Sequence, residues 1–281
     1  MTIIEAIILG ILQGLSEFLP ISSTAHLTLA GHFMGLIDPS NTEKWTAFIA
    51  VVQMGTLFAV LFYFYNELKS ISTTMFKENI GSNRIAFRNQ SFNSKMGWYI
   101  IVGSIPIFVI GYLLKKLIEG GITKDPLVIA SSLIILAVFL YVAEKRGKLF
   151  KKFESISFSD SLLIGLAQCL ALIPGASRSG TTLTAGMFLG IDRAAAARFS
   201  FLLSIPAVLV SGVYEFYKSL PYMSNQEYLA LIIAVSAAFL SGYATIAFLI
   251  KFLQTKTTMI FISYRIVLGL IIIILHLFNV L

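Results

Sequence analysis

Hydrophobic residues dominate this chain in long runs, and polar residues interrupt them at a few places. About 20 apolar residues are enough to cross the hydrocarbon core as a helix. Six runs meet that length: 44–65, 96–116, 126–144, 194–217, 228–252 and 259–278. Four further apolar segments are too short or too broken to span: 2–18, 24–36, 160–173 and 181–190. The pattern predicts an all-α polytopic membrane protein.

The four shorter segments fit two re-entrant helical hairpins, which enter the membrane and return. Such hairpins are tolerated where protein or a water-filled cavity satisfies the backbone. Segments 9–35 and 164–190 also read alike. Each runs from apolar residues through a Gln and a Pro into a serine-rich stretch, then ends in Ala-Gly and a later Gly. The likeness indicates an internal repeat.

Three predicted spans separate the two hairpins, so the second hairpin enters from the opposite face. We therefore expect one membrane domain, 1–281, with an inverted-topology repeat: repeat 1 at about 1–150 and repeat 2 at about 155–281. Each half is a re-entrant helical hairpin plus three transmembrane helices. Inverted repeats commonly place a binding site near the bilayer midplane, where broken helices point their ends at a ligand.

Composition agrees with a membrane protein, and the charges predict its orientation. The chain is 57% hydrophobic and 12% charged, with a mean hydropathy of +0.85. Loops 66–95, 145–159 and 253–258, with Lys251, carry twelve Lys and Arg residues against five on the other face. The positive-inside rule makes these loops cytoplasmic and places both termini outside. The net charge of +7 is then mostly an orientation signal, and no nucleic-acid partner is expected.

The longest polar stretch, 66–95, is basic but has little apolar periodicity. We expect a polar loop there and no separate soluble domain. The single cysteine, Cys169, excludes an intramolecular disulfide, and its apolar setting indicates packing.

The first polar segment combines a carboxylate, hydroxyls and an imidazole. Gln13 and Glu17 are four residues apart and share a helix face. The stretch 20–24 contains a proline and three hydroxyl residues, which break that helix and cap the next one. A helix that starts near Ser23 keeps His26 close. These are the parts of acid–base or nucleophilic chemistry. The alternative is a satisfied polar cluster that only stabilises a helix break.

The second polar segment, 174–182, predicts an anion-binding cradle. Gly175 and Gly180 permit left-handed or closely approached backbone, so consecutive N–H groups can point at one ligand. Arg178 supplies a forked cation that matches phosphate oxygens, and a helix N-terminus there adds its positive end. The hydroxyls of the segment add further donors: Ser177, Ser179, Thr181 and Thr182. An arginine inside a hydrophobic hairpin needs an anionic partner.

Both polar segments resemble the undecaprenyl-diphosphate phosphatase family, also known as bacitracin-resistance proteins. Gln13 and Glu17 to Pro20 match its pattern of Glu or Gln, three residues, then Glu-Phe-Leu-Pro. Its Pro-Gly-x-Ser-Arg-Ser motif is met in full by 174–179. The likeness extends to Ser22, Ser23 and His26 and to segments 48–64 and 264–269, so it covers nearly the whole chain. Many members have Glu where this chain has Gln13, so a metal bridging two carboxylates would lack one here.

The resemblance implies hydrolysis of undecaprenyl diphosphate to undecaprenyl phosphate and inorganic phosphate in the bacterial plasma (inner) membrane. That reaction recycles the lipid carrier of peptidoglycan precursors and confers bacitracin resistance. The expected catalytic residues are Glu17, Ser23, His26 and Arg178. Ser23 is the leading nucleophile, Glu17 its general base or orienter, and His26 donates a proton or activates water. Attack by His26 or directly by water stays open. The expected substrate-binding residues are Gln13, Ser22, Gly175, Ser177, Ser179, Gly180, Thr181 and Thr182.

A polyanionic substrate favours a divalent cation, Mg²⁺ or Ca²⁺, although no set of three metal ligands is visible and no organic cofactor is expected. The expected partners are a polyprenyl diphosphate lipid and the bilayer, and a homodimer is compatible with the sequence. A rival from another class is a lipid-phosphate flippase or anion transporter, because secondary transporters are also built from inverted repeats with broken helices.

Overall fold

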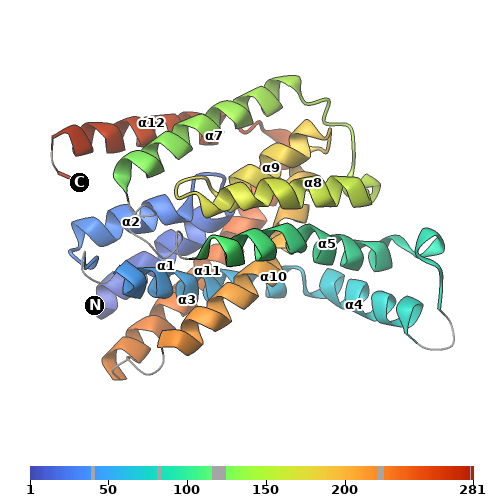
Figure 1. The fold of residues 1–281 in the computed structure, drawn as a ribbon, viewed down its shortest axis with the longest axis horizontal. Helices are drawn as coiled ribbons and strands as arrows, with labels where there is room; N and C mark the ends of the chain where they lie inside the picture. The colour runs from blue at the N-terminus through green and yellow to red at the C-terminus, as the bar shows by residue number, and fades with distance from the viewer. Residues whose placement is uncertain (39–41, 81–83, 116–124, 220–224, 279) are drawn as a thin grey trace.

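The computed structural model describes residues 1–38, 42–80, 84–115, 125–219, 225–278 and 280–281. Within these residues all regular structure is helical, apart from one isolated bridge between Lys151 and Ile191. The helices run lengthwise in a bundle, and both termini lie at the same end of it (Figure 1).

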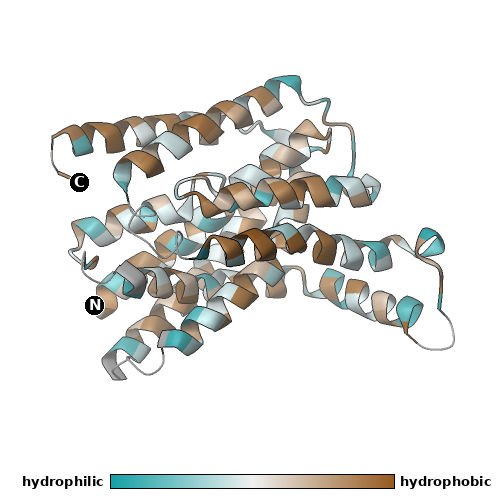
Figure 2. Ribbon diagram, in the orientation of Figure 1, coloured by the Kyte–Doolittle hydropathy of each residue, from teal (hydrophilic) through white to brown (hydrophobic). Residues whose placement is uncertain are grey.

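Six helices in the described ranges are long and apolar enough to cross a membrane, which confirms the six predicted spans. They are α3 (Thr42–Tyr63), α5 (Phe92–Leu113), α7 (Pro126–Arg146), α10 (Arg193–Ser219), α11 (Asn225–Thr255) and α12 (Met259–Leu277). Figure 2 shows hydrophobic residues along the middle of the bundle and hydrophilic ones gathered toward its ends. This distribution is typical of an all-α membrane protein.

Four shorter helices pair at the positions of the two predicted hairpins, and the entry of these hairpins into the membrane stays a prediction. The first hairpin is α1 (Ile3–Phe18) and α2 (Ser23–Phe33). The second is α8 (Phe158–Gln168), extended by the 3-10 turn η4 (Cys169–Leu172), and α9 (Arg178–Phe188). We call residues 19–22 the first helix break and residues 173–177 the second helix break.

The two hairpins share backbone features at a spacing of 155 residues. Ser22 and Ser177 are the N-caps of α2 and α9, with positive φ angles of 74° and 70°. Positive φ is uncommon for a residue other than glycine. Gly35 and Gly190, again 155 residues apart, follow the same two helices with φ of 65° and 83°. The recurrence agrees with the predicted internal repeat.

Each hairpin packs on helices of the opposite half. Helix α1 packs against α11, and α8 packs against α5. Glycine makes both approaches close: a Cβ on Gly10 would lie 2.3 Å from the carbonyl oxygen of Ala234, and one on Gly165 would lie 2.1 Å from that of Gly103. Helix α9 packs on α7 and α10, and α7 packs on α12.

Residues 66–95 differ from the expected polar loop. They contain α4 (Tyr65–Asn79) and the 3-10 turn η1 (Phe87–Asn89). Ile71 of α4 is buried, and a Cβ on Gly97 would touch Ile71 and Met75. Ile71 and Met75 of α4 therefore pack against α5. The sequence pattern missed the helix because its apolar stripe is narrow, and tertiary packing supplies most helical stability.

Candidate active site

Three donors converge on the carboxylate of Glu17 in the last turn of α1. Gln13 Nε2 donates to Oε2 at 2.8 Å, and Ser23 Oγ donates to the same oxygen at 2.6 Å. Arg178 Nη2 donates to Oε1 at 2.7 Å. Glu17 is only 5% exposed. A buried carboxylate requires such partners, and here they come from both predicted polar segments.

The two helix breaks explain why these groups meet. Gln13 and Glu17 lie one turn apart on α1. Ser23 is the first residue of α2, and Arg178 is the first residue of α9. Each break therefore brings the first residue of the following helix into contact with Glu17. Helix N-termini favour negative charge, so the arrangement suits an anionic ligand.

The hydroxyl of Ser23 is placed to react. Its proton is directed at Glu17, and the residue is 8% exposed. A hydroxyl that donates to a carboxylate keeps its lone pairs available to an electrophile, and the carboxylate can accept the proton as the new bond forms. This geometry fits the predicted pair of nucleophile and general base.

His26 makes two hydrogen bonds, and neither goes to Ser23. Nδ1 lies 2.7 Å from the carbonyl oxygen of Ser22, and Nε2 lies 2.7 Å from the hydroxyl of Tyr264. A carbonyl only accepts, so Nδ1 carries a proton, and in the neutral ring Nε2 accepts from Tyr264. The two rings are stacked, with centroids 5.6 Å apart. In this geometry the His26 ring is bound to Ser22 and Tyr264, so it is not placed as the base for Ser23, the predicted nucleophile.

Two serines of the second polar segment link the two helix breaks by hydrogen bonds. Ser177 Oγ accepts the N–H of Gly180 at 3.2 Å and lies 3.1 Å from Ser179 Oγ. Ser179 donates to the carbonyl oxygen of Leu19 in the first helix break at 3.0 Å. The predicted residues are brought together, but these contacts join protein to protein. Their role in substrate binding stays a prediction.

Thr181 and Thr182 use their hydroxyls within the fold. Both Oγ1 atoms donate to the carbonyl oxygen of Arg178, at 3.0 and 2.8 Å. Thr182 Oγ1 also lies 2.6 Å from Ser200 Oγ of α10. These bonds stabilise the first turn of α9, and the anion-binding role of the two residues stays a prediction.

The two glycines of the predicted anion cradle differ in why a side chain is excluded there. Gly175 has the left-handed backbone that was predicted, with φ of 84°, and a Cβ there would lie 2.4 Å from the carbonyl oxygen of Ile129. Gly180 does not: it lies inside α9, and its N–H is bound by Ser177. The missing Cβ of Gly180 instead leaves room for Arg265, whose Nη1 would be 2.6 Å away.

Two buried polar atoms of the cluster have no hydrogen-bond partner within the described part of the chain. They are Nη1 of Arg178 and Oε1 of Gln13. Buried polar groups are nearly always paired, so unpaired ones call for an explanation. The Nη1 donor belongs to the guanidinium that binds Glu17, and a phosphate oxygen is a suitable acceptor for it.

The cluster is a poor fit for a metal held by the protein alone. Among the described residues, no group of three or more His, Cys, Asp and Glu side chains is placed to hold an ion. Glu17 is the one carboxylate in the cluster, and its oxygens are already bound by three donors. Mg²⁺ and Ca²⁺ require several oxygen ligands.

Sequence reasoning missed two residues of α12 that reach the cluster, Tyr264 and Arg265. Tyr264 contacts His26, and Arg265 contacts both helix breaks. A signal was present, since an arginine in the middle of a predicted span is a functional hypothesis by default. The local sequence gave no indication of which hairpin α12 approaches.

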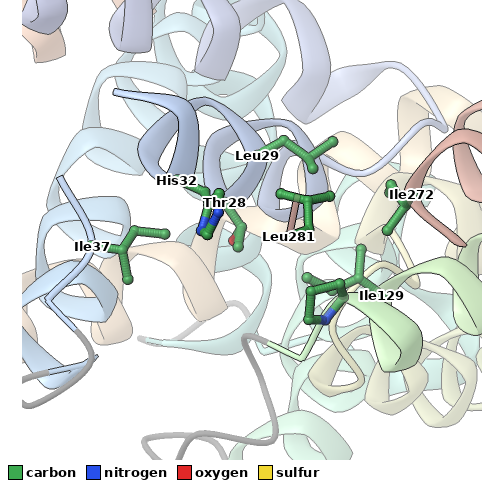
Figure 3. A pocket seen from close by; sticks show the side chains of 8 residues that line it. Thr28, Leu29, His32, Ile37, Ile129, Ile272 and Leu281 are labelled. Carbon is green, nitrogen blue, oxygen red and sulfur yellow. The ribbon is translucent and has the colours of Figure 1, made fainter. Parts of the chain in front are cut away.

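A cavity of about 80 Å³ lies between α2, the start of α7 and the end of α12, and its walls are mostly apolar (Figure 3). Its lining is Thr28, Leu29, His32, Ile37, Pro126, Ile129, Ile272 and Leu281. None of the predicted site residues lines it. Ser23 and Arg178 instead both bind the buried carboxylate of Glu17.

Comparison with known proteins identifies the family. Residues 6–271 match the family described as bacitracin resistance protein BacA. The chain is 52% identical to the undecaprenyl-diphosphatase of Syntrophobacter fumaroxidans over 269 residues, covering 96% of this chain and 95% of that protein. It is 46% identical to the undecaprenyl-diphosphatase of Chloroherpeton thalassium, with the same coverage of both chains. The corresponding protein of Myxococcus xanthus is 44% identical, with 98% and 89% covered. This chain therefore belongs to the bacitracin resistance protein BacA family.

Proposed function

We propose that this protein hydrolyses undecaprenyl diphosphate to undecaprenyl phosphate and inorganic phosphate, and that this reaction confers bacitracin resistance by recycling the lipid carrier. Relatives that match nearly the whole chain carry the name of that activity. The observation that carries the proposal is one buried carboxylate, Glu17, bound to both a serine hydroxyl and a guanidinium. These are the parts that phosphoryl transfer needs: a nucleophile, a proton acceptor and a cation.

In the proposed complex the terminal phosphoryl group lies against Arg178. The unpartnered Nη1 of Arg178 donates to a phosphate oxygen, and the N-termini of α2 and α9 add their positive ends. The guanidinium stays bound to Glu17, so the phosphate that it binds lies close to the proposed general base. Electrostatic stabilisation of the charge that develops on phosphate oxygens is the main contribution that a protein can make to this chemistry.

The reaction then proceeds in two displacements. Ser23 Oγ attacks the terminal phosphorus while Glu17 accepts its proton, and the bond to the bridging oxygen breaks. Undecaprenyl phosphate leaves, and the phosphoryl group stays on Ser23. Water next attacks the same phosphorus, gives its proton to a neighbouring base, and releases inorganic phosphate. Ser23 recovers its proton from Glu17.

His26 is better placed to assist the second displacement than to act as the nucleophile of the first. Both of its ring nitrogens are hydrogen-bonded, to Ser22 and Tyr264, so attack by His26 would require it to leave these partners. We assign it to proton transfer with water or with the departing phosphate. The contact between Ser23 and Glu17 favours Ser23 over direct attack by water.

A divalent cation enters this proposal with the substrate. The diphosphate is polyanionic, and its own oxygens are good ligands for Mg²⁺ or Ca²⁺. Gln13 Oε1 is a buried acceptor of the cluster that has no hydrogen-bond partner among the described residues. No step of the mechanism depends on the ion.

The protein is multi-pass in a membrane, with six candidate spans in the described ranges. We place it in the bacterial plasma membrane with both termini outside and the two halves inverted across the bilayer. The positions of the ends support this placement, because both termini lie at one end of the bundle and α4 lies at the other (Figure 1). A homodimer stays a prediction. Measuring the molecular mass of the protein in detergent tests it.

Phosphate release from undecaprenyl diphosphate by detergent-purified protein tests the proposal. We expect turnover by the natural chain and none above background by Ser23→Ala, with both proteins melting at similar temperatures. A flippase or anion transporter would release no phosphate, because transport needs two compartments and changes no bond. No phosphate release by folded natural protein, with and without Mg²⁺ or Ca²⁺, would exclude the proposed function.

A further inference from the structure

Arg265 is a buried arginine in the middle of α12. Its side chain is 0% exposed, and it is among the largest fully buried side chains of the described chain. A charge placed there is costly unless hydrogen bonds satisfy it. Packing alone therefore does not account for an arginine at this position.

All hydrogen bonds of the Arg265 guanidinium within the described residues go to backbone carbonyl oxygens. Nη1 donates to Pro20 of the first helix break at 3.2 Å. Nη2 donates to Ala176 at 3.0 Å and to Gly175 at 3.4 Å, both in the second helix break. Nε donates to Leu133 of α7 at 3.1 Å. One side chain of α12 thus joins both helix breaks to α7.

No carboxylate of the described residues forms an ion pair with Arg265. The ion pairs in the described part of the chain involve other residues, and Arg265 has only carbonyl acceptors. Its Nη1 lies against Gly180 in the first turn of α9, where a Cβ would approach it to 2.6 Å. An unneutralised cation beneath this helix N-terminus adds to the attraction for an anion.

We propose that Arg265 is a positioning residue for the hydrolysis: it holds both helix breaks in place and adds its buried charge beneath the anion cradle. The inference rests on the proposed function. Ser23 and Arg178 each follow one of the two breaks directly. A shift of either break would separate them from Glu17, and small displacements of reacting groups are costly to rate.

Two substitutions separate the charge from the geometry. Arg265→Lys keeps the charge, but one ammonium group cannot bind carbonyl oxygens of both breaks in the geometry of a guanidinium fork. Arg265→Met keeps an unbranched apolar stem and loses both charge and donors. Ile262→Ala is the matched control, because Ile262 is a buried residue of the same helix outside the cluster.

The measurements are the melting temperature in detergent, kcat and KM for undecaprenyl diphosphate, and the binding of inorganic pyrophosphate by ligand-induced thermal shift. For Arg265→Met we expect kcat to fall by about 100-fold and pyrophosphate binding to weaken by about 10-fold. For Arg265→Lys we expect kcat to fall while pyrophosphate binding stays near that of the natural chain. Ile262→Ala should lower the melting temperature and change neither quantity in the folded protein.

Natural kcat and natural pyrophosphate binding in folded Arg265→Met would overturn the proposal. So would an equal loss in Ile262→Ala at an equal fall in melting temperature. If neither Arg265 variant folds, Ser132→Ala decides, because Ser132 Oγ donates to Pro174 of the second helix break. A lower kcat at an unchanged melting temperature supports the part of the proposal by which the position of the second helix break controls turnover, and a natural kcat there overturns that part. Absence of phosphate release by the natural chain is a separate result, and pyrophosphate binding still tests Arg265.

Discussion

Ser23 and Arg178 occupy equivalent positions, 155 residues apart, and hydrogen-bond to opposite oxygens of one carboxylate. Each is the first helical residue after an N-cap serine with positive φ. Ser23 Oγ binds Glu17 Oε2, and Arg178 Nη2 binds Glu17 Oε1. One backbone arrangement, used twice, therefore presents the proposed nucleophile from one half and the anion-binding cation from the other.

The carboxylate between them has no such counterpart. The position 155 residues after Glu17 is Leu172, in the 3-10 turn that ends the first arm of the second hairpin. The α1 helix stays regular to Phe18, whereas the equivalent helix tightens after Gln168. The two halves share a backbone arrangement, and the proposed catalytic groups are side chains in which the halves differ.

The first prediction concerns Arg178. Arg178→Ala removes the guanidinium from Glu17 and from the proposed phosphate, so kcat/KM should fall by about 10²- to 10³-fold, as when other preorganised charge stabilisers are removed. Arg178→Lys keeps the charge without the fork and should lose less. Initial rates of phosphate release measure both. Turnover of Arg178→Ala close to that of the natural chain would remove Arg178 from the site.

The second prediction concerns Glu17. Glu17→Gln keeps the size of the side chain but gives a poor proton acceptor, so most turnover should be lost while the protein still inserts and purifies. A quench of the reaction within the first turnover should yield no phosphorylated Ser23. An active Glu17→Gln would mean that another group removes the proton from the nucleophile.

The third prediction separates His26 from Tyr264. His26→Ala should abolish most turnover. Tyr264→Phe keeps the stacked ring and removes one hydrogen bond to Nε2, so kcat should fall by about tenfold, the size of a single hydrogen bond. Tyr243→Phe is the control, since Tyr243 lies in α11 and is 43% exposed against 44% for Tyr264. Equal effects of the two Tyr→Phe changes would leave Tyr264 without a role at the site.

The fourth prediction concerns Gln13, which also binds Glu17 but carries no charge. Gln13→Ala should reduce kcat less than Glu17→Gln does, because a neutral amide can only position or solvate the carboxylate. Steady-state rates of the two variants, compared at saturating substrate, give the order directly. If Gln13→Ala is inactive while Glu17→Gln turns over, the roles assigned to this helix face are reversed.

Much of this arrangement could be predicted from sequence because its signals are local. Span length predicts the six long helices α3, α5, α7, α10, α11 and α12. The proline and hydroxyl residues of stretch 20–24 predict a cap for α2, and segment 174–182 predicts the start of α9. The meeting of Glu17 with Arg178 was foreseeable only through the repeat. Tyr264 and Arg265 could not be assigned to partners, since their contacts are more than 80 residues away in sequence. At Gly180 the structure shows the closely approached alternative, and the sequence could not name Arg265 as the neighbour that requires the missing Cβ.

The last prediction concerns topology, because it tests the charge asymmetry and the inverted repeat together. Asp38 precedes α3, and Ser155 follows α7; both are exposed. Three long helices separate them, so they should lie on opposite faces of the membrane, with Ser155 on the basic, cytoplasmic face. In a Cys169→Ser background, Asp38→Cys should react with an impermeant maleimide in intact cells. Ser155→Cys should react only after permeabilisation. Labelling of both from outside would mean an even number of crossings between them, and the two hairpins would then enter from the same face.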